Sequence, residues 1–139
     1  MNLLATTTRL DRLEQIATAT VKVAPAAAAG VTATAHAGGA FAKGAYVQII
    51  PAAAVTSRFR LSAIISDNQS AADEYEIDIA QGLAAAEVII ATIKVPVHGR
   101  FLISSDYLLP GTRISARIGV RDAVARTCDI SVEFSDNLI

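Results

Sequence analysis

The segment RISARIGVRDAVARTCDISVEF, residues 113–134, contains the clearest structural pattern in the chain. Apolar and polar side chains alternate in it twice, and the apolar members are Ile114, Ala116, Ile118 and Val120, then Cys128, Ile130, Val132 and Phe134. Alternation with a period of two residues predicts strands with one buried face. The polar loop at residues 121–126 predicts that the two strands form a hairpin. In that hairpin Arg113 and Arg117 are expected to lie opposite Asp129 and Glu133.

The same alternation extends toward the N-terminus. Residues 58–66 and 74–80 each show an apolar face, made of Phe59, Leu61, Ala63 and Ile65, then Tyr75, Ile77 and Ile79. Shorter strands are predicted at residues 31–35, 45–50, 87–95 and 101–104, separated by Pro and Gly turn signals. About seven or eight short strands, with no strand–helix–strand rhythm, predict an all-β fold: an antiparallel β-sandwich or jelly roll.

The first 30 residues lack the clear strand alternation of the rest of the chain. We interpret residues 1–30 as an N-terminal arm, either extended or a short helix, and residues 31–139 as the sandwich domain. A helix would place an apolar row on one side, made of Leu3, Leu4, Leu10, Leu13 and Ile16. The alternative is a first pair of strands packed on the domain.

Composition narrows the class of partner. The chain has 139 residues and a formal net charge of −1, which argues against a nucleic-acid-binding protein. No apolar run reaches the roughly 18 residues of a membrane span, and no secretory signal is expected at the N-terminus. The single cysteine, Cys128, is interpreted as a small core residue.

The residues that usually perform catalysis are scarce. The two histidines, His36 and His98, lie in or beside small-residue turns, so we assign them no metal or general-base role. Asp73, Glu74, Glu76 and Asp78 raise the possibilities of a calcium site or a glycosidase pair. Alternation instead places Glu74, Glu76 and Asp78 on one solvated strand face. We therefore expect no enzymatic activity, no catalytic residues, no metal and no cofactor.

Two segments resemble a group of small virion proteins of tailed bacteriophages. They are YEIDIAQGLAAAEVIIATI, residues 75–93, and LLPGTRISARIGVRDAVARTCDISVEF, residues 108–134. The matching positions are Asp78, Ile79, Gly82, Glu87, Pro110, Gly111, Arg113, Ile114 and Arg117, followed by a final strand at residues 127–134. The resemblance covers roughly residues 45–134, and the first 30 residues find no match. The usual Pro-Ala-Gly turn of these proteins lacks its alanine here.

The resemblance implies a β-sandwich coat component of the virion, assembled in the host cytoplasm. The favoured role is a homotrimeric capsid decoration (cement) protein that binds the major capsid protein or other virion proteins. A tail or head-fibre component is the close alternative. A carbohydrate-binding β-sandwich, with Tyr107 as its exposed aromatic residue, is a further alternative.

Candidate functional residues are therefore interface residues. The apolar row of the arm is one set. The second set is charged: Arg58, Arg60, Arg113 and Arg117 are expected to meet the acidic face of Glu74, Glu76 and Asp78, either within one chain or between chains.

Overall fold

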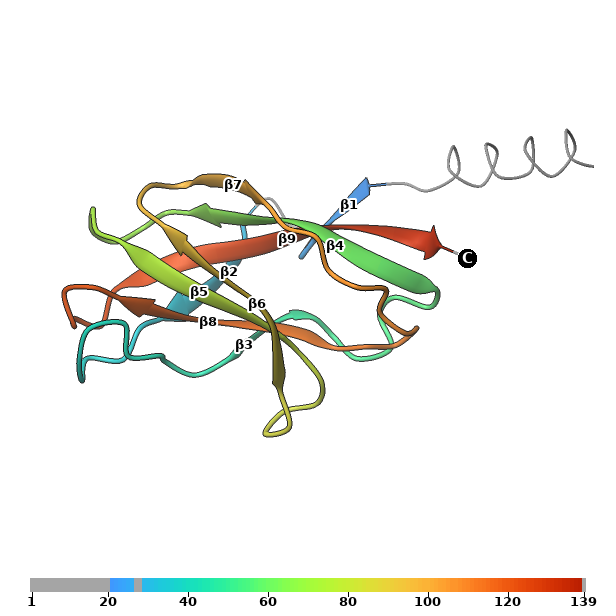
Figure 1. Cartoon of the computed structure of the whole chain (residues 1–139), viewed down its shortest axis with the longest axis horizontal. Coiled ribbons are helices and arrows are strands. Elements are labelled where there is room, and N and C mark those ends of the chain that lie inside the picture. Colours follow the sequence, from blue (N-terminus) through green and yellow to red (C-terminus); the bar gives the residue numbers. More distant parts are fainter. Residues whose placement is uncertain (1–20, 27–28, 139) are drawn as a thin grey trace, which may run out of the picture.

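The computed structural model describes residues 21–26 and 29–138 of the chain. These residues form an all-β structure of two antiparallel sheets packed as a sandwich (Figure 1). The strands are β1 (Val21–Ala24), β2 (Val31–Thr34), β3 (Val47–Ile50), β4 (Arg58–Asp67), β5 (Tyr75–Gln81), β6 (Val88–Val95), β7 (Gly99–Leu102), β8 (Ile114–Val120) and β9 (Thr127–Leu138). None of the described residues belongs to a helix able to cross a membrane.

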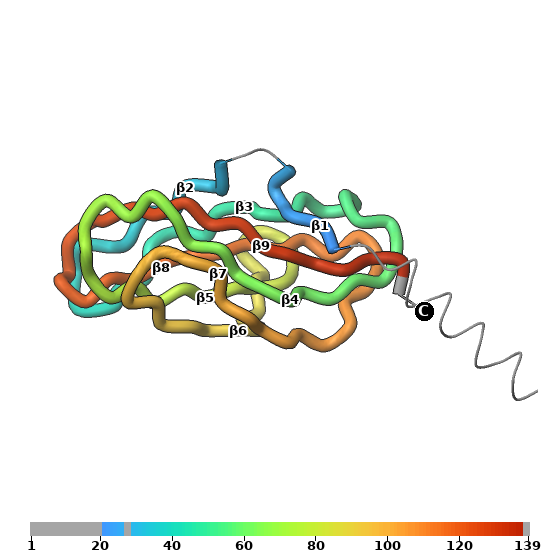
Figure 2. The backbone as a smooth tube through the Cα atoms, turned by 90° about the horizontal axis from the view of Figure 1, so that it is seen from above, coloured from blue at the N-terminus to red at the C-terminus, as the bar shows by residue number. Residues whose placement is uncertain are grey.

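β9 is the axis of the first sheet. It pairs with β1 and β2 along one edge and with β4 along the other, and β7 completes the sheet beyond β4 (Figure 2). The second sheet has the order β3-β8-β5-β6. Every ladder between named strands is antiparallel.

Strand pairing is nested around one turn. β5 pairs with β6, β4 with β7, β3 with β8, and β2 with β9. The segment from β2 to β9 is therefore one long antiparallel hairpin whose central turn is residues 82–87. Further pairing of β4 with β9 and of β5 with β8 rolls this hairpin into two layers.

The hairpin that the sequence predicted between the last two strands is wrong. β8 and β9 belong to different sheets, so Arg113 and Arg117 do not lie opposite Asp129 and Glu133. Alternation is set by which face of a strand is buried, and a strand that buries one face fits either sheet. The nested pairing gives both strands other neighbours.

The alternation itself is confirmed in three strands. The predicted inward rows of β5, β8 and β9 are all buried, and Cys128 is fully buried as expected of a core residue. Burial raises the pKa of the Cys128 thiol to about 11, so the thiol is neutral near pH 7. Phe134 of β9 meets Phe59 of β4 edge to face, with ring centroids 5.9 Å apart.

The alternation predicted for β4 fails after Leu61. The ladder with β9 shifts register between Leu61 and Ala63, and this bulge turns Ile64 into the core while Ile65 is only half-buried. An extra residue in one strand exchanges the faces of the residues that follow it.

The N-terminal 30 residues are divided by the structure. Val21–Ala24 form β1, which is part of the β9 sheet, and β2 begins at Val31. The proposed arm contacts Leu3, Leu4, Leu10, Leu13 and Ile16 lie outside the described residues.

The bulge makes a prediction about two adjacent isoleucines. Ile64→Ala is expected to lower the free energy of unfolding by about 2–5 kcal/mol, the usual cost of a cavity at a buried site. Ile65→Ala is the matched control and is expected to cost about 1 kcal/mol, mainly through strand propensity. Urea unfolding followed by circular dichroism measures both. The reverse ranking would mean that the strand continues without a bulge.

Candidate functional site

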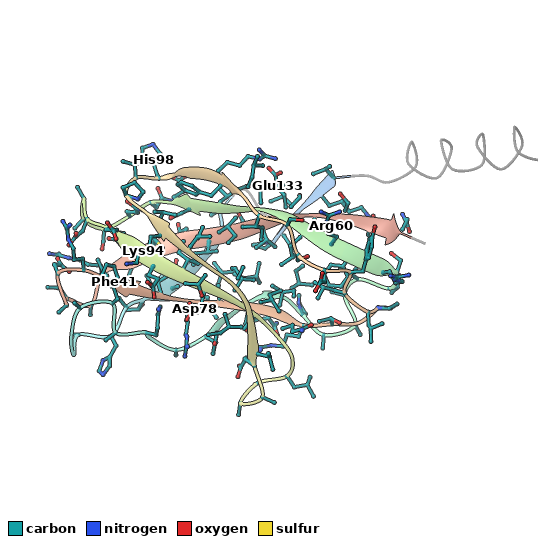
Figure 3. The ribbon with its side chains drawn as sticks, in the orientation of Figure 1. Phe41, Arg60, Asp78, Lys94, His98 and Glu133 are labelled. Atoms are coloured by element: carbon teal, nitrogen blue, oxygen red, sulfur yellow. The ribbon has the colours of Figure 1, made fainter. Side chains whose placement is uncertain are left out.

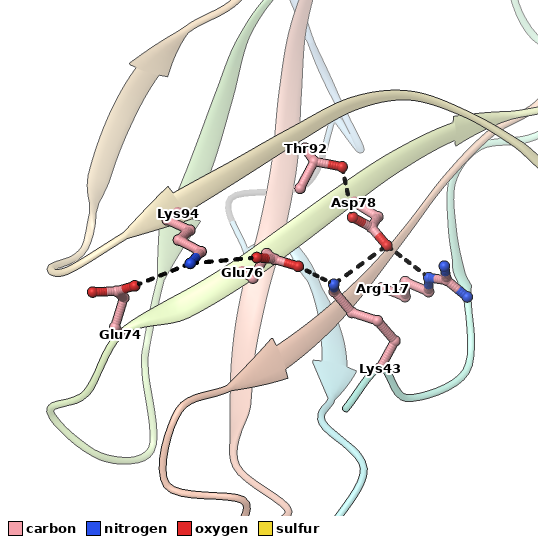
Figure 4. Close-up of polar contacts among 7 residues, drawn as sticks. All are labelled: Lys43, Glu74, Glu76, Asp78, Thr92, Lys94 and Arg117. Carbon is pink, nitrogen blue, oxygen red and sulfur yellow. Dashed lines mark hydrogen bonds and ion pairs between the residues drawn. The ribbon is translucent and has the colours of Figure 1, made fainter. Parts of the chain in front are cut away.

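Among the described residues, a connected group of charged side chains lies on the outer face of the β3-β8-β5-β6 sheet (Figure 4). Strand register builds it: Asp78 of β5 stands between Thr92 of β6 and Arg117 of β8, and Glu76 stands between Lys94 and Gly119. Side chains directly opposite on neighbouring strands are close enough to interact. The row thus follows from placing β5 between β6 and β8, with polar residues of the three strands at facing positions.

Asp78 is the buried centre of this group. Its side chain is only 4% exposed. Thr92 Oγ1 donates a hydrogen bond to Asp78 Oδ1 at 2.8 Å, and Arg117 Nε donates to Asp78 Oδ2 at 2.8 Å. Lys43 Nζ lies 3.6 Å from the same Oδ2 atom. The expectation of a fully solvated acidic face is therefore wrong for Asp78, because two cations and a hydroxyl cover its carboxylate.

Lys43 reaches the row from outside the sheet, over the gap left by Gly119. A Cβ atom at Gly119 would stand 2.4 Å from the Phe41 carbonyl oxygen, far inside contact distance. Phe41 N–H donates to the Val120 carbonyl and Gly44 N–H to the Ile118 carbonyl, which fixes this segment beside β8. With the backbone so placed, Lys43 also contacts Glu76.

Aromatic rings of the same segment cover two of the cations. Lys94 Nζ lies 4.6 Å from the centre of the Phe41 ring, and the Arg117 guanidinium lies 4.6 Å from the centre of the Tyr46 ring. Lys94 also lies 3.9 Å from both Glu74 and Glu76. Cations held over ring faces are electrostatically stabilised. The group is thus an internally neutralised surface, with each carboxylate facing a cation of the same chain.

The structure brings together only part of the charged set predicted from sequence. Arg117 does meet Asp78, within one chain. Arg113 instead contacts Glu87 at 3.3 Å and Gln48 at 3.0 Å. Arg58 and Arg60 lie on β4, in the other sheet, so they do not meet Glu74, Glu76 or Asp78 within one chain. Figure 3 shows Arg60 apart from Asp78. A contact between chains stays a prediction.

Sequence reasoning missed Lys43, Lys94, Thr92 and the two rings. A signal for them did exist: Gly119 interrupts the row of polar residues that starts at Arg113 and continues through Ser115 and Arg117 of β8. A glycine inside a strand often marks a close approach of another backbone. That signal locates the gap without identifying the segment that fills it.

The acidic row matches neither the glycosidase pair nor the calcium site that were considered from the sequence. Glu76 and Asp78 are two residues apart on one strand face, whereas the two carboxyl groups of a glycosidase flank the scissile bond. Within residues 21–26 and 29–138, no cluster of three or more His, Cys, Asp and Glu residues is arranged to hold a metal ion. His98 lines a shallow polar recess with Asp67 and Asn68, at one end of the sandwich.

An apolar recess of about 730 Å³ lies between β1 and β3. Val23, Pro25, Val31, Ile50 and Phe134 contribute to its walls. Lys22 is the one charged residue among the described residues of the lining, and its ammonium group is paired with Asp136 at 2.5 Å. The lining therefore supplies no pair of groups for acid–base chemistry.

None of the protein-family models, curated proteins or solved structures compared with the chain matches it.

The burial of Asp78 predicts a stability effect. Asp78→Ala is expected to lower the free energy of unfolding by about 3 kcal/mol, because Lys43 and Arg117 lose their common partner. Glu74→Ala, which removes only a 3.9 Å contact with Lys94, is the control and is expected to cost less than about 1 kcal/mol. Chemical unfolding measures both variants. Unchanged stability with weakened self-association would instead make this face a contact between chains.

The other sheet predicts a dependence on pH. Two hydrogen bonds from Arg100 to Glu133, each 2.7 Å long, lower the pKa of that carboxyl below its ordinary value of 4.5. Hydrogen bonds from Thr32 and Asn68 likewise lower the pKa of Asp129 below 3.8. Carboxyls with lowered pKa values stabilise the fold above the unfolded-state pKa, and this stabilisation is lost as the pH falls through the folded-state pKa.

The urea midpoint is therefore expected to fall between about pH 5 and pH 3. The Asp129→Asn/Glu133→Gln double variant should show a shallower fall. A double variant with the same acid limb as the unmodified chain would show that other groups control it.

Proposed function

We propose that this chain is a non-enzymatic virion structural protein, a decoration (cement) protein that stabilises the head of a tailed bacteriophage. It works as a homotrimer that bridges subunits of the major capsid protein. It needs no cofactor and contacts neither nucleic acid nor membrane. The observation that carries the proposal is the nested order of its strands.

We propose that the sandwich is a jelly roll. In support, the two sheets contain the orders β2-β9-β4-β7 and β3-β8-β5-β6, as expected when a long hairpin is rolled into two layers, and β1 adds to the first sheet beside β9. Jelly rolls occur in viral capsid and lectin domains. The resemblance of residues 75–93 and 108–134 to phage virion proteins favours the capsid role over the lectin role.

The pairing of charged side chains within the chain supports a structural role. The acidic row of β5 is neutralised by Lys43, Lys94 and Arg117 of the same chain. A catalytic site needs titratable groups that converge on a space open to substrate. Here the charged side chains instead link β5 to β6, to β8 and to the segment that carries Lys43, which suits a stable structural protein.

We further propose that the residues before Val21 form an anchoring arm on a neighbouring virion protein. β1 is paired with β9, so the proposed arm would join the sandwich where β1 begins. Its candidate contacts are those of the apolar row defined from sequence: Leu3, Leu4, Leu10, Leu13 and Ile16. An arm enlarges a contact beyond the area that one small domain offers.

A carbohydrate-binding module is the second candidate, and one observation favours it. Tyr107 is 53% exposed, as a sugar-stacking ring requires. The Arg58 guanidinium already lies 4.9 Å from the centre of that ring, which occupies one of its faces. Binding on a glycan array that is lost in Tyr107→Ala would establish this alternative.

The capsid role is tested by adding the purified chain to empty heads that lack it, prepared from the phage that carries the gene. The chain is expected to sediment with the heads, to saturate at a fixed ratio and to raise the temperature at which the heads break. Binding to isolated tails alone would assign it to the tail. A chain that stays in the supernatant with both would contradict a virion role.

A further inference from the structure

A few charged side chains of the described residues have no ion-pair partner within the chain. Among the described residues, Arg58 and Arg60 are the cations without an ion-pair partner. Asp67, Asp106 and Asp129 are the corresponding anions in that part of the chain. Their positions are not scattered, because two groups of them mark opposite ends of β4 and β9.

The basic end consists of Arg58, Arg60, Tyr107 and Leu109. Arg58 covers Tyr107, and Arg60 donates a hydrogen bond to Ser104 at 2.5 Å. The Tyr107 ring is 53% exposed and Leu109 is 71% exposed. Asp106 is also at this end, so the charges without partners sum to one positive charge. Arginine and tyrosine are residue types enriched where proteins bind one another.

The acidic end consists of Asp67, Asp129, Val97 and Val124. Asp67 and Asp129 are direct partners across the β4–β9 ladder. Like charges in that position destabilise a sheet. The chain nevertheless holds Asp129 in place with hydrogen bonds from Thr32 and Asn68, at 2.5 Å and 2.8 Å. Val97 is 59% exposed and Val124 is 42% exposed.

The two ends cannot meet within one copy. Arg60 and Asp67 are seven positions apart on β4, which corresponds to about 23 Å along a strand. Figure 3 shows Arg60 and His98, which lies beside Asp67, toward different ends of the sandwich. Two apposed carboxylates at one end and two arginines at the other are complementary only when a second molecule supplies the opposite end.

We propose that copies of this chain bind head to tail, with the basic end of one copy seated against the acidic end of the next. This inference rests on the proposed homo-oligomer and identifies the surfaces that build it. The contact uses different surfaces on the two copies, so repetition closes into a ring when the rotation between copies allows it. A homotrimer is such a ring, with three identical contacts and no end left over.

Charge exchange tests the contact. Arg60→Glu and Asp67→Lys are each expected to weaken self-association at least tenfold, because each places like charges in the interface. The double variant is expected to regain most of the lost affinity, since the introduced carboxylate of one copy then faces the introduced ammonium group of the next. Sedimentation velocity over a concentration series measures association, and thermal melting checks that each variant is folded. Arg60→Gln, which removes the positive charge without reversing it, serves as the comparison and is expected to weaken self-association less than Arg60→Glu does.

The outcomes separate this inference from the proposed function. Rescue in the double variant supports the head-to-tail contact, because the two positions are too far apart to interact within one copy. Oligomers that are insensitive to both single changes, or single losses without rescue, would overturn it and leave the capsid role intact. Loss of head binding with unchanged self-association would also overturn it, and would assign the basic end to a capsid protein.

Discussion

The structure depends on the pairing of β9 along both of its edges. Its inward row of Cys128, Ile130, Val132 and Phe134 is buried, and its partners come from the first residues of the domain and from the middle of the chain. The core therefore closes only after segments more than 60 positions apart have met, as in the Ile64–Val132 pair. Such non-local pairing folds slowly. Because β9 is paired along both edges, its backbone hydrogen-bonding groups are used within the described part of the chain.

Contacts within the chain also determine the outer face of the second sheet. Removing one side chain, at Gly119, admits the backbone of Phe41, and this brings Lys43 to Asp78 and Glu76. Carboxylates that resemble a binding surface in the sequence form ion pairs within the chain. Charges that remain without partners among the described residues are instead placed at the two ends of the sandwich. We propose that these two ends are the surfaces available for binding.

The sequence predicted which faces are buried better than which strands are neighbours. Alternation located the inward rows of β5, β8 and β9, because burial of one face leaves a period of two residues in the sequence. It failed in β4, where a bulge after Leu61 exchanges Ile64 and Ile65 between faces. It also failed to separate β8 from β9, since strand register is set by contacts distant in sequence. For the acidic row the strand face was foreseeable, whereas Lys43 reaches it from a loop that has no period at all.

Because the charges on the sheet faces are paired within the described part of the chain, we propose that the chain acts through its two ends, and this proposal requires that it assemble with itself. Native mass spectrometry of the unmodified chain at micromolar concentration tests this requirement most directly. We expect a trimer with three times the 14.5 kDa mass of the single chain, which weakens as salt is added because the contacts are partly ionic. A species of 14.5 kDa at every concentration and salt level would contradict it.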